Sequence, residues 1–275
     1  MKIKKEYTFT NNRQIWRIIP TQTDKLIVEE RDTEKKEAFF NCIEIDSGKK
    51  IFKNFQLDEK YWIGIETVYK DIIFFHEFLK PDMPGHKGII AFNIYSRQIL
   101  WKTDDYIFLF IYDDKVFCYK LKFEGRNFYT LNFKTGELIK DLGDNAIAVN
   151  ELRERNISDT PIEDCLFPVP FIPSSDEDQR IKNLLQNYKH GTVITGKIEY
   201  IRLNDLILLN FHEVINNGKL RNLFKAIDIE SEKVIFEEVL NDETQAFVPD
   251  SFFVKGNFIF LLKNKVKLVV CSVGK

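Results

Sequence analysis

One short pattern recurs along the chain: an apolar strand that ends in Asp or Asn, a tight turn that contains Ser or Thr, and a second apolar strand. This repeat constrains the fold more than any other feature, because a repeated unit buries its apolar face only against its neighbours. Successive copies in the first half of the chain are spaced by roughly 40 to 50 residues, which is room for four short strands each. The copies occupy Ile45–Phe52, Phe92–Trp101, Leu131–Ile139 and Ile227–Phe236.

Groups of apolar runs lie around these turns and are rich in the β-branched and aromatic residues that favour strands. The last group has three strands, and residues 2–10 show the alternation of an exposed edge strand that can complete it. We therefore predict an all-β fold, a single β-propeller domain over 1–275 with five four-stranded blades, closed by the N-terminal strand. The strand groups lie over 14–55, 61–102, 106–142, 193–239 and 246–272.

The spacing between the third and fourth copies is about twice that of the others, which leaves room for a further blade or for an insertion within one blade. We favour an insertion near 150–190, because the prolines and many acids of its first half make a poor strand pattern. Ser174 and Glu177 have the spacing of a capping box, and the apolar residues that follow recur at helical spacing. A short amphipathic helix that stops at Gly191 is therefore predicted.

Composition limits the partners and the location that we expect. The formal net charge is −2, so no overall field favours nucleic acid. A strongly apolar run such as Tyr106–Tyr112 is far shorter than the roughly 20 residues of a membrane helix, and no apolar signal segment follows Met1. The 4 cysteines are scattered, with no paired spacing. We predict a cytoplasmic monomer with reduced cysteines and no membrane insertion, although a protein that has lost a signal peptide would look the same.

Two resemblances add to this interpretation. The turns at Asp46–Phe52 and Asn132–Ile139 resemble the repeat of quinoprotein-type (PQQ-like) propellers, whereas the copies at Ser96 and Ser231 lack its Gly. The block from Trp62 to Trp101 is similar to an uncharacterised bacterial family of propeller-like domains of unknown function, mainly from Bacteroidetes. It carries Gly64, Glu66, His76, Pro81, Met83, Pro84, Gly85, His86, Lys87 and Gly88.

These resemblances imply a propeller fold, and they carry over no functional residue. Quinoprotein dehydrogenases are much larger and have adjacent paired cysteines in the active site, whereas this chain has no such pair. We therefore predict no quinone and no other cofactor.

The stretch Glu77–Gly88 is the most unusual part of the chain, because two Pro and two Gly residues preset a rigid path between two predicted strands. His76 and His86 with Asp82 are residue types that ligate metals, and Glu66 with His86 are types that transfer protons. Because the spacing matches no zinc motif, we interpret the stretch as an ordered hairpin loop and predict no metal site. The candidate binding residues are Trp62, Glu66, His76, Asp82, His86 and Lys87.

Other conspicuous residues have structural interpretations. Trp16, Trp62 and Trp101 are expected to pack between blades. The Asp or Asn of each repeated turn is expected to bond the backbone two residues on. Residues 151–178 hold eight acids against two Arg, and we interpret them as a solvated insertion or a docking surface.

Common enzyme signatures, such as a phosphate-binding loop, a zinc-binding HExxH helix or a nucleophile elbow, are absent from the sequence. The leading hypothesis is a non-catalytic binding or scaffolding propeller for an unknown protein or small-molecule ligand. Its contacts would come from 77–88 and from the 150–190 insertion. The alternative is a hydrolase or lyase that acts on a carbohydrate-like substrate through a Glu/His/Asp site on the second blade.

Overall fold

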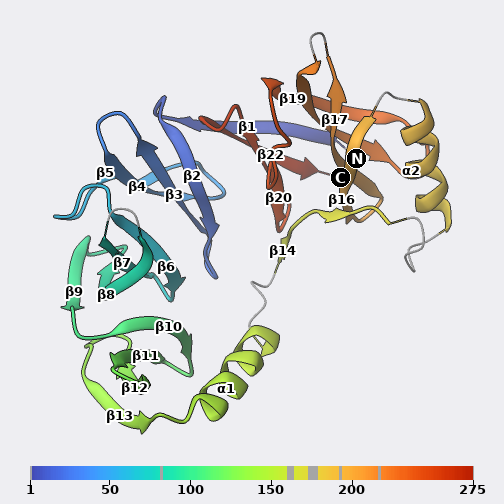
Figure 1. The fold of residues 1–275 in the computed structure, drawn as a ribbon. Coiled ribbons are helices and arrows are strands. Elements are labelled where there is room, and N and C mark those ends of the chain that lie inside the picture. The colour runs from blue at the N-terminus through green and yellow to red at the C-terminus, as the bar shows by residue number, and fades with distance from the viewer. Residues whose placement is uncertain are drawn as a thin grey trace. The chain divides into compact units, whose positions relative to one another are not determined.

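The computed structural model describes residues 2–80, 83–159, 164–172, 179–191, 194–215 and 218–274. Strands in these residues form five antiparallel sheets of four or five strands (Figure 1), which confirms the all-β prediction. The chain divides into two compact units, Met1–Arg13 with Asp164–Lys275 (unit 1) and Gln14–Glu163 (unit 2). That 1–275 is a single domain stays a prediction.

Unit 2 contains three four-stranded sheets, each made of strands that follow one another in the chain. Their bounds agree with the predicted strand groups to within a few residues, apart from the hairpin at 77–88. The first sheet comprises β2 (Gln14–Pro20), β3 (Lys25–Asp32), β4 (Glu37–Glu44) and β5 (Lys50–Phe55); the second β6 (Ile63–Tyr69), β7 (Ile72–Lys80), β8 (Met83–Asn93) and β9 (Gln98–Thr103); the third β10 (Ile107–Tyr112), β11 (Lys115–Lys122), β12 (Gly125–Asn132) and β13 (Leu138–Gly143).

Alternation along the strands builds the core of unit 2, because successive side chains point to opposite faces of a sheet. In β7, Ile73 and Phe75 pack toward the first sheet, where the rings of Phe75 and Phe40 lie 4.7 Å apart. Phe74, between them, packs with Cys118 in the core shared with the third sheet. The second sheet is therefore apolar on both faces, and it packs between its two neighbours.

Unit 1 contains two sheets, and both ends of the chain meet in one of them. Its β1 (Lys2–Thr10) pairs with β22 (Lys267–Gly274) from Lys2 opposite Gly274 to Thr10 opposite Lys267 (Figure 1), which confirms that the N-terminal strand completes the last group. The other strands of that sheet are β21 (Phe258–Lys263), β20 (Phe252–Lys255) and β14 (Cys165–Leu166); the remaining sheet comprises β15 (Val169–Pro170), β16 (Ile194–Leu203), β17 (Leu206–Val214), β18 (Leu220–Asp228) and β19 (Val234–Thr244).

The region predicted as an insertion is more ordered than its sequence indicates. Helix α1 (Ala146–Asp159) was not predicted, and the very short β14 and β15 each extend a sheet where we expected no strands. Helix α2 (Gln179–Gly191) is confirmed, and its buried Ile181 and Leu185 pack on β16 to β18. The predicted capping pair Ser174 and Glu177 lies outside the described residues. Neither α1 nor α2, nor any other helix in the described ranges, is long and apolar enough to cross a membrane.

Three of the four repeated turns use their Asp or Asn to bind backbone N–H groups, whereas in the turn after Ile45 the hydroxyl of Ser47 accepts the N–H of Lys49 at 3.1 Å. Asn93 Oδ1 accepts hydrogen bonds from the backbone N–H groups of Tyr95 (3.0 Å) and Ser96 (2.8 Å), and Asn132 and Asp228 accept comparable bonds in their own turns. Each turn therefore satisfies backbone donors that would otherwise lack a partner.

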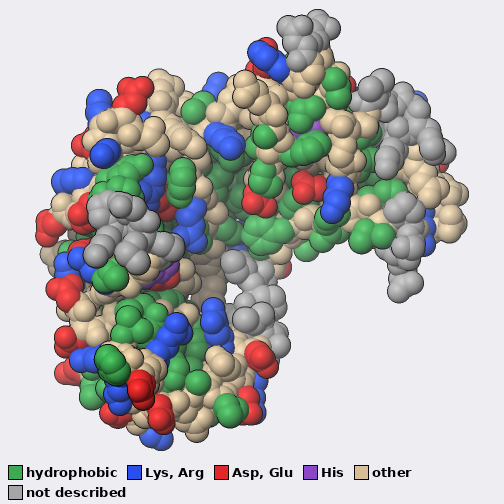
Figure 2. Space-filling view, viewed as in Figure 1, with side chains coloured by type: hydrophobic (Ala, Val, Ile, Leu, Met, Phe, Trp, Pro, Cys, Tyr) green, Lys and Arg blue, Asp and Glu red, His purple; other side chains and the backbone are tan. Residues whose placement is uncertain are grey.

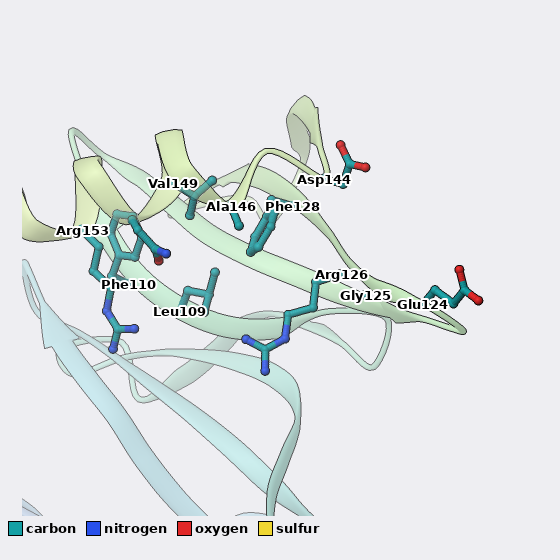
Figure 3. A pocket seen from close by; sticks show the side chains of 11 residues that line it. Leu109, Phe110, Glu124, Gly125, Arg126, Phe128, Asp144, Ala146, Val149 and Arg153 are labelled. Atoms are coloured by element: carbon teal, nitrogen blue, oxygen red, sulfur yellow. The ribbon is translucent and has the colours of Figure 1, made fainter.

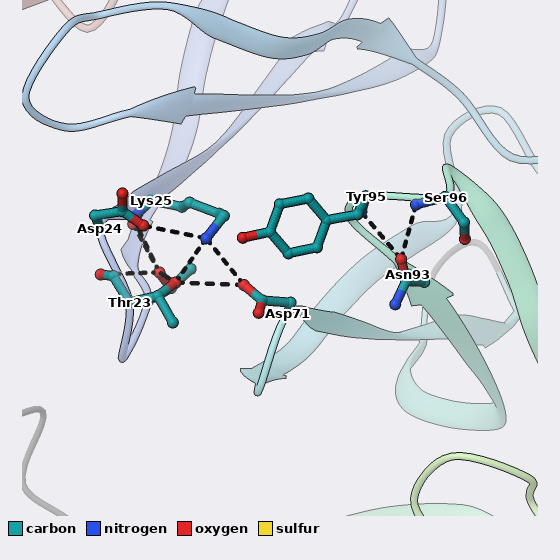
Figure 4. A network of polar contacts seen from close by, with 8 residues as sticks. Thr23, Asp24, Lys25, Asp71, Asn93, Tyr95 and Ser96 are labelled. Atoms are coloured by element: carbon teal, nitrogen blue, oxygen red, sulfur yellow. Dashed lines mark hydrogen bonds and ion pairs between the residues drawn. The ribbon is translucent and has the colours of Figure 1, made fainter.

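Lys25 ties one of these turns to the neighbouring sheet (Figure 4). Its buried ammonium group lies 3.1 Å from carboxylate oxygens of both Asp24 and Asp71, and 4.8 Å from the ring centre of Tyr95. Burial lowers the pKa of Lys25, but its bonds to Tyr95, Asp71 and Asp24 outweigh burial and hold that pKa above its ordinary value. Lys25 therefore stays charged, and it links the first sheet to the second.

Candidate functional site

We predicted a hairpin loop over Glu77–Gly88, and this prediction is wrong. The stretch forms the extended end of a strand pair. Strand β7 continues to Lys80 and β8 begins at Met83, with Glu77 opposite Lys87 and Phe78 opposite His86. The register also shifts between Ile65 and Thr67 of β6, so Glu66 lies outside the regular pairing. Such bulges re-aim side chains, and here they turn a carboxylate toward two histidines.

Glu66, His76 and His86 form one cluster on three adjacent strands, β6, β7 and β8. Nδ1 of His86 lies 2.8 Å from Oε1 of Glu66, within hydrogen-bonding distance, and Nδ1 of His76 lies 3.0 Å from the same oxygen. The two imidazole rings stack with centres 3.5 Å apart and planes 7° from parallel. Two imidazoles from neighbouring strands therefore converge on one carboxylate oxygen of Glu66.

His76 is the buried member of the cluster, with 3% of its surface exposed. Neither ring nitrogen has a hydrogen-bond partner, because the Glu66 oxygen near Nδ1 lies off the direction of the ring N–H and makes only an ion-pair contact. Gly64 makes room for this ring, since a Cβ at that position would lie 2.9 Å from Cε1 and Nε2 of His76. Phe78 meets both imidazoles edge-on, at 5.0 Å from His76 and 5.6 Å from His86.

The two histidines keep the carboxyl group of Glu66 ionised. Burial raises the pKa of Glu66, but the adjacent His76 and His86 outweigh burial and hold that pKa below its ordinary value. Glu66 is consequently ionised at neutral pH. An ionised carboxylate beside two imidazoles can accept or pass on a proton, bind a cation, or hold the hydroxyl groups of a ligand.

Glu66 also lines a cleft of about 870 Å³ within unit 2. One wall is β6 from Glu66 to Tyr69 with Lys70 of the turn that follows, and another is β10, including Phe110. Helix α1, which was not predicted, contributes Arg153 and Asn156, so it borders the same cleft as Glu66. His86 is 36% exposed at its side chain, which leaves the cluster accessible on one side.

A second cavity of about 480 Å³ lies between α1 and the third sheet (Figure 3). Phe128 and Val149 line its interior between helix and strands, whereas Glu124 lies at the hairpin tip away from them (Figure 3). Arg153 borders both cavities. On the face shown in Figure 2, positive and negative side chains are interspersed and no large patch of one sign stands out.

Of the other predicted site residues, the two that the structure describes, Trp62 and Lys87, do not join the cluster. Trp62 packs its ring edge-on against Tyr61 and Phe78. Lys87 is 3.4 Å from the carboxylate of Glu77. Asp82 lies outside the described residues.

The prediction for the tryptophans is only partly right. Trp101 packs in the core and donates its indole N–H to the carbonyl of Phe133 at 3.0 Å. Trp16, in contrast, is 55% exposed and stacks over the guanidinium of Arg31, 5.6 Å away, so it does not fill a core position. A cation–π contact with Arg31 takes the place of the apolar packing that we expected for Trp16.

Sequence reasoning missed two contributors to the site. Arg153 was counted only as a charge in a solvated insertion. Gly64 carried a usable signal, because a Gly inside an apolar strand often marks a close approach by another group.

Comparisons with known proteins give a family match over part of the chain and a distant structural likeness. Residues 19–101, which include Glu66, His76 and His86, match a family model described as a domain of unknown function (DUF4905). No curated protein matches the chain. Among solved structures it is similar to a bifunctional GH43-CE protein of Bacteroides eggerthii, at 11% identity and a TM-score of 0.29, covering 99% of this chain and 34% of that one. The chain thus spans about a third of that protein, and so distant a likeness says nothing about activity.

Proposed function

We propose that this chain is a non-catalytic binding protein and that its ligand site is the cleft beside Glu66. The observation that carries the proposal is the cleft itself, whose volume of about 870 Å³ lies in the range of small-molecule sites. Sheet strands supply Glu66 on one wall, and α1 supplies Arg153 on another. Rigid strands with a helix at their margin are a common arrangement for recognition.

The lining favours a small, polar, hydroxylated ligand that carries an acidic group. Tyr69 and Tyr112 offer aromatic surface, Asn156 and Glu66 offer hydrogen-bonding groups, and Arg153 offers a cation. Lys70, which also lines the cleft, already pairs with Asp114 at 2.5 Å. Arg153 is therefore the better cation for an acidic group, since its planar guanidinium can bind a carboxylate through two hydrogen bonds.

A thermal-shift screen of sugars and sugar acids tests the proposal with two variants of α1. Arg153→Ala removes a cleft cation, whereas Arg155→Ala removes an exposed cation on the same helix that does not line the cleft. We expect an acidic sugar to raise the melting temperature of the parent and of Arg155→Ala, with at least about tenfold weaker binding to Arg153→Ala. Equal binding by both variants, or no binder in the panel, contradicts the proposal.

The alternative, an acid–base enzyme acting on a carbohydrate-like substrate, gains from one observation. The hydrogen bond of 2.8 Å between His86 and Glu66 lies at the wall of a concave site. The cluster itself supplies one carboxylate, Glu66, whereas glycoside hydrolysis generally needs two. Turnover of aryl glycosides by the parent, lost in Glu66→Gln, would favour the enzyme over the binding protein.

The finer fold assignment is also a proposal. We infer that the five sheets are blades of one closed ring with PQQ-like repeats, because sheets within each unit pack face to face as blades do. Small-angle scattering from a monomer tests this, since an open arrangement has a larger radius of gyration than a ring. Bacterial origin, cytoplasmic location and the monomeric state stay predictions.

A further inference from the structure

We propose that Glu66, His76 and His86 bind a divalent transition-metal cation, with zinc as the representative ion. The ligand atoms of these three side chains lie within 4.8 Å of one another. Ligand atoms held at about 2.1 Å from a zinc ion are about 3.0 to 3.4 Å apart, depending on the bond angle. The distances of 2.8 and 3.0 Å from Glu66 Oε1 to the two Nδ1 atoms are close to this range, and the two stacked imidazole rings must also tilt so that both Nδ1 lone pairs point at the ion.

The second observation is the state of His76. A buried polar group without a hydrogen bond costs free energy, and native proteins rarely leave one unsatisfied. His76 is 3% exposed, and its two ring nitrogens lack hydrogen-bond partners although Nδ1 lies 3.0 Å from a carboxylate oxygen of Glu66. A metal ion placed between Nδ1 and Glu66 supplies the missing interaction, because a neutral imidazole nitrogen coordinates a cation through its lone pair.

The surroundings hold these groups in place. Gly64 allows the His76 ring to approach β6 closely, and Phe78 forms a T-shaped contact with each imidazole. Two nitrogen ligands and one carboxylate favour zinc and its neighbours in the first transition series over calcium or magnesium, which prefer oxygen ligands alone. The set also leaves coordination positions open beside the cleft that Glu66 lines, so a bound ion can exchange with solvent or contact a ligand there.

Zinc binding by the full chain tests the inference without any cleft ligand. Protein dialysed against a chelator is titrated calorimetrically with zinc chloride, and bound zinc is counted by elemental analysis. We expect one zinc per chain with a dissociation constant of about 1 µM or tighter, and at least about 100-fold weaker binding by Glu66→Gln and by His86→Ala. Both substitutions suit a folded protein, because the first is nearly isosteric and His86 is 36% exposed at its side chain.

Glu77→Gln is the matched control. Glu77 lies next to His76 in β7 and is 19% exposed, but its carboxylate pairs with Lys87 and Lys102 instead of the histidines. The Glu77→Gln variant should bind zinc as the parent does. Circular dichroism verifies that each variant is folded. Absence of zinc binding by the parent would show that the three groups share protons only, and binding that survives in Glu66→Gln and His86→Ala would place the ion elsewhere. Either result overturns the inference and leaves the cleft proposal to its own test.

Discussion

At the scale of single residues, Glu29 shows how burial and charge compete in this protein. It is 1% exposed, and one carboxylate oxygen accepts a hydrogen bond from Nε of Arg31 at 2.8 Å. Burial raises the pKa of Glu29 above its ordinary value, against the opposing attraction of Arg31, Arg17 and His76. The folded chain therefore binds a proton at Glu29 more readily than the unfolded chain does.

This gives a pH dependence with a definite sign. Because the folded state holds more protons at Glu29, the free energy of unfolding falls as pH rises from the ordinary pKa through the raised one. Glu29→Gln should remove this fall in the free energy of unfolding. The fall amounts to about 1.4 kcal/mol for each unit by which folding raises the pKa of Glu29. Urea unfolding at mildly acidic and at neutral pH measures this change in the free energy of unfolding. The control is Glu124→Gln, because Glu124 is exposed. If Glu29→Gln keeps the pH dependence of the parent, then Glu29 is not its source.

The candidate site shows which residue-level features can be predicted from sequence. His76, His86 and Glu66 were selected because their side chains suit proton transfer or metal binding. Their convergence depends on register shifts after Ile65 and Phe75, and β7 begins with four consecutive apolar residues, which show no alternation that could mark such a shift. The residues could therefore be identified from the chemistry of their side chains. The bulges that bring them together could not be predicted from the sequence.

At the scale of elements, local signals explain what was predicted and what was missed. Strands with alternating or continuous apolar residues, bounded by Asn or Gly turns, were located to within a few residues. Helix α1 was missed because its sequence, from Ala146 to Asp159, has no sustained apolar stripe. Its contact with the third sheet through Val149 and Leu152 is a tertiary feature, so periodicity alone does not reveal it.

The turn at Gly136 offers a test of how the repeat fits its neighbour. Gly136 has a φ of +73°, and a Cβ there would lie 2.6 Å from the indole of Trp101. Gly136→Ala combines backbone strain with displacement of a packed ring and should lower the free energy of unfolding by about 2 to 4 kcal/mol. Gly143→Ala is the control, because its φ of +65° is similar and nothing lies within 4 Å of the added Cβ. Equal losses in chemical unfolding would mean that Trp101 is not a constraint on this turn.

At the scale of the whole molecule, the two units differ in how many segments of the chain they contain. Unit 1 takes residues from both ends of the chain, whereas unit 2 is a continuous segment. The hydroxyl of Thr10 donates to the carbonyl of Val266, 256 residues away in sequence. Contacts of such long range close a large loop, and their entropic cost makes them slow to form. The sheet of β1 and β22 is therefore expected to assemble late.

Phe9 tests whether that sheet is a separate source of stability. It is 2% exposed in β1, opposite Leu268, so Phe9→Ala should cost about 3 to 5 kcal/mol. Lys4→Ala, on the exposed side of the same strand, is the control. Because the contacts of Phe9's strand belong to unit 1, hydrogen exchange should accelerate in β20 to β22 of Phe9→Ala, with little change in β2 to β13. Uniform acceleration across both units would instead mean that the chain unfolds as one cooperative block, in which the seam between its two ends supports every sheet.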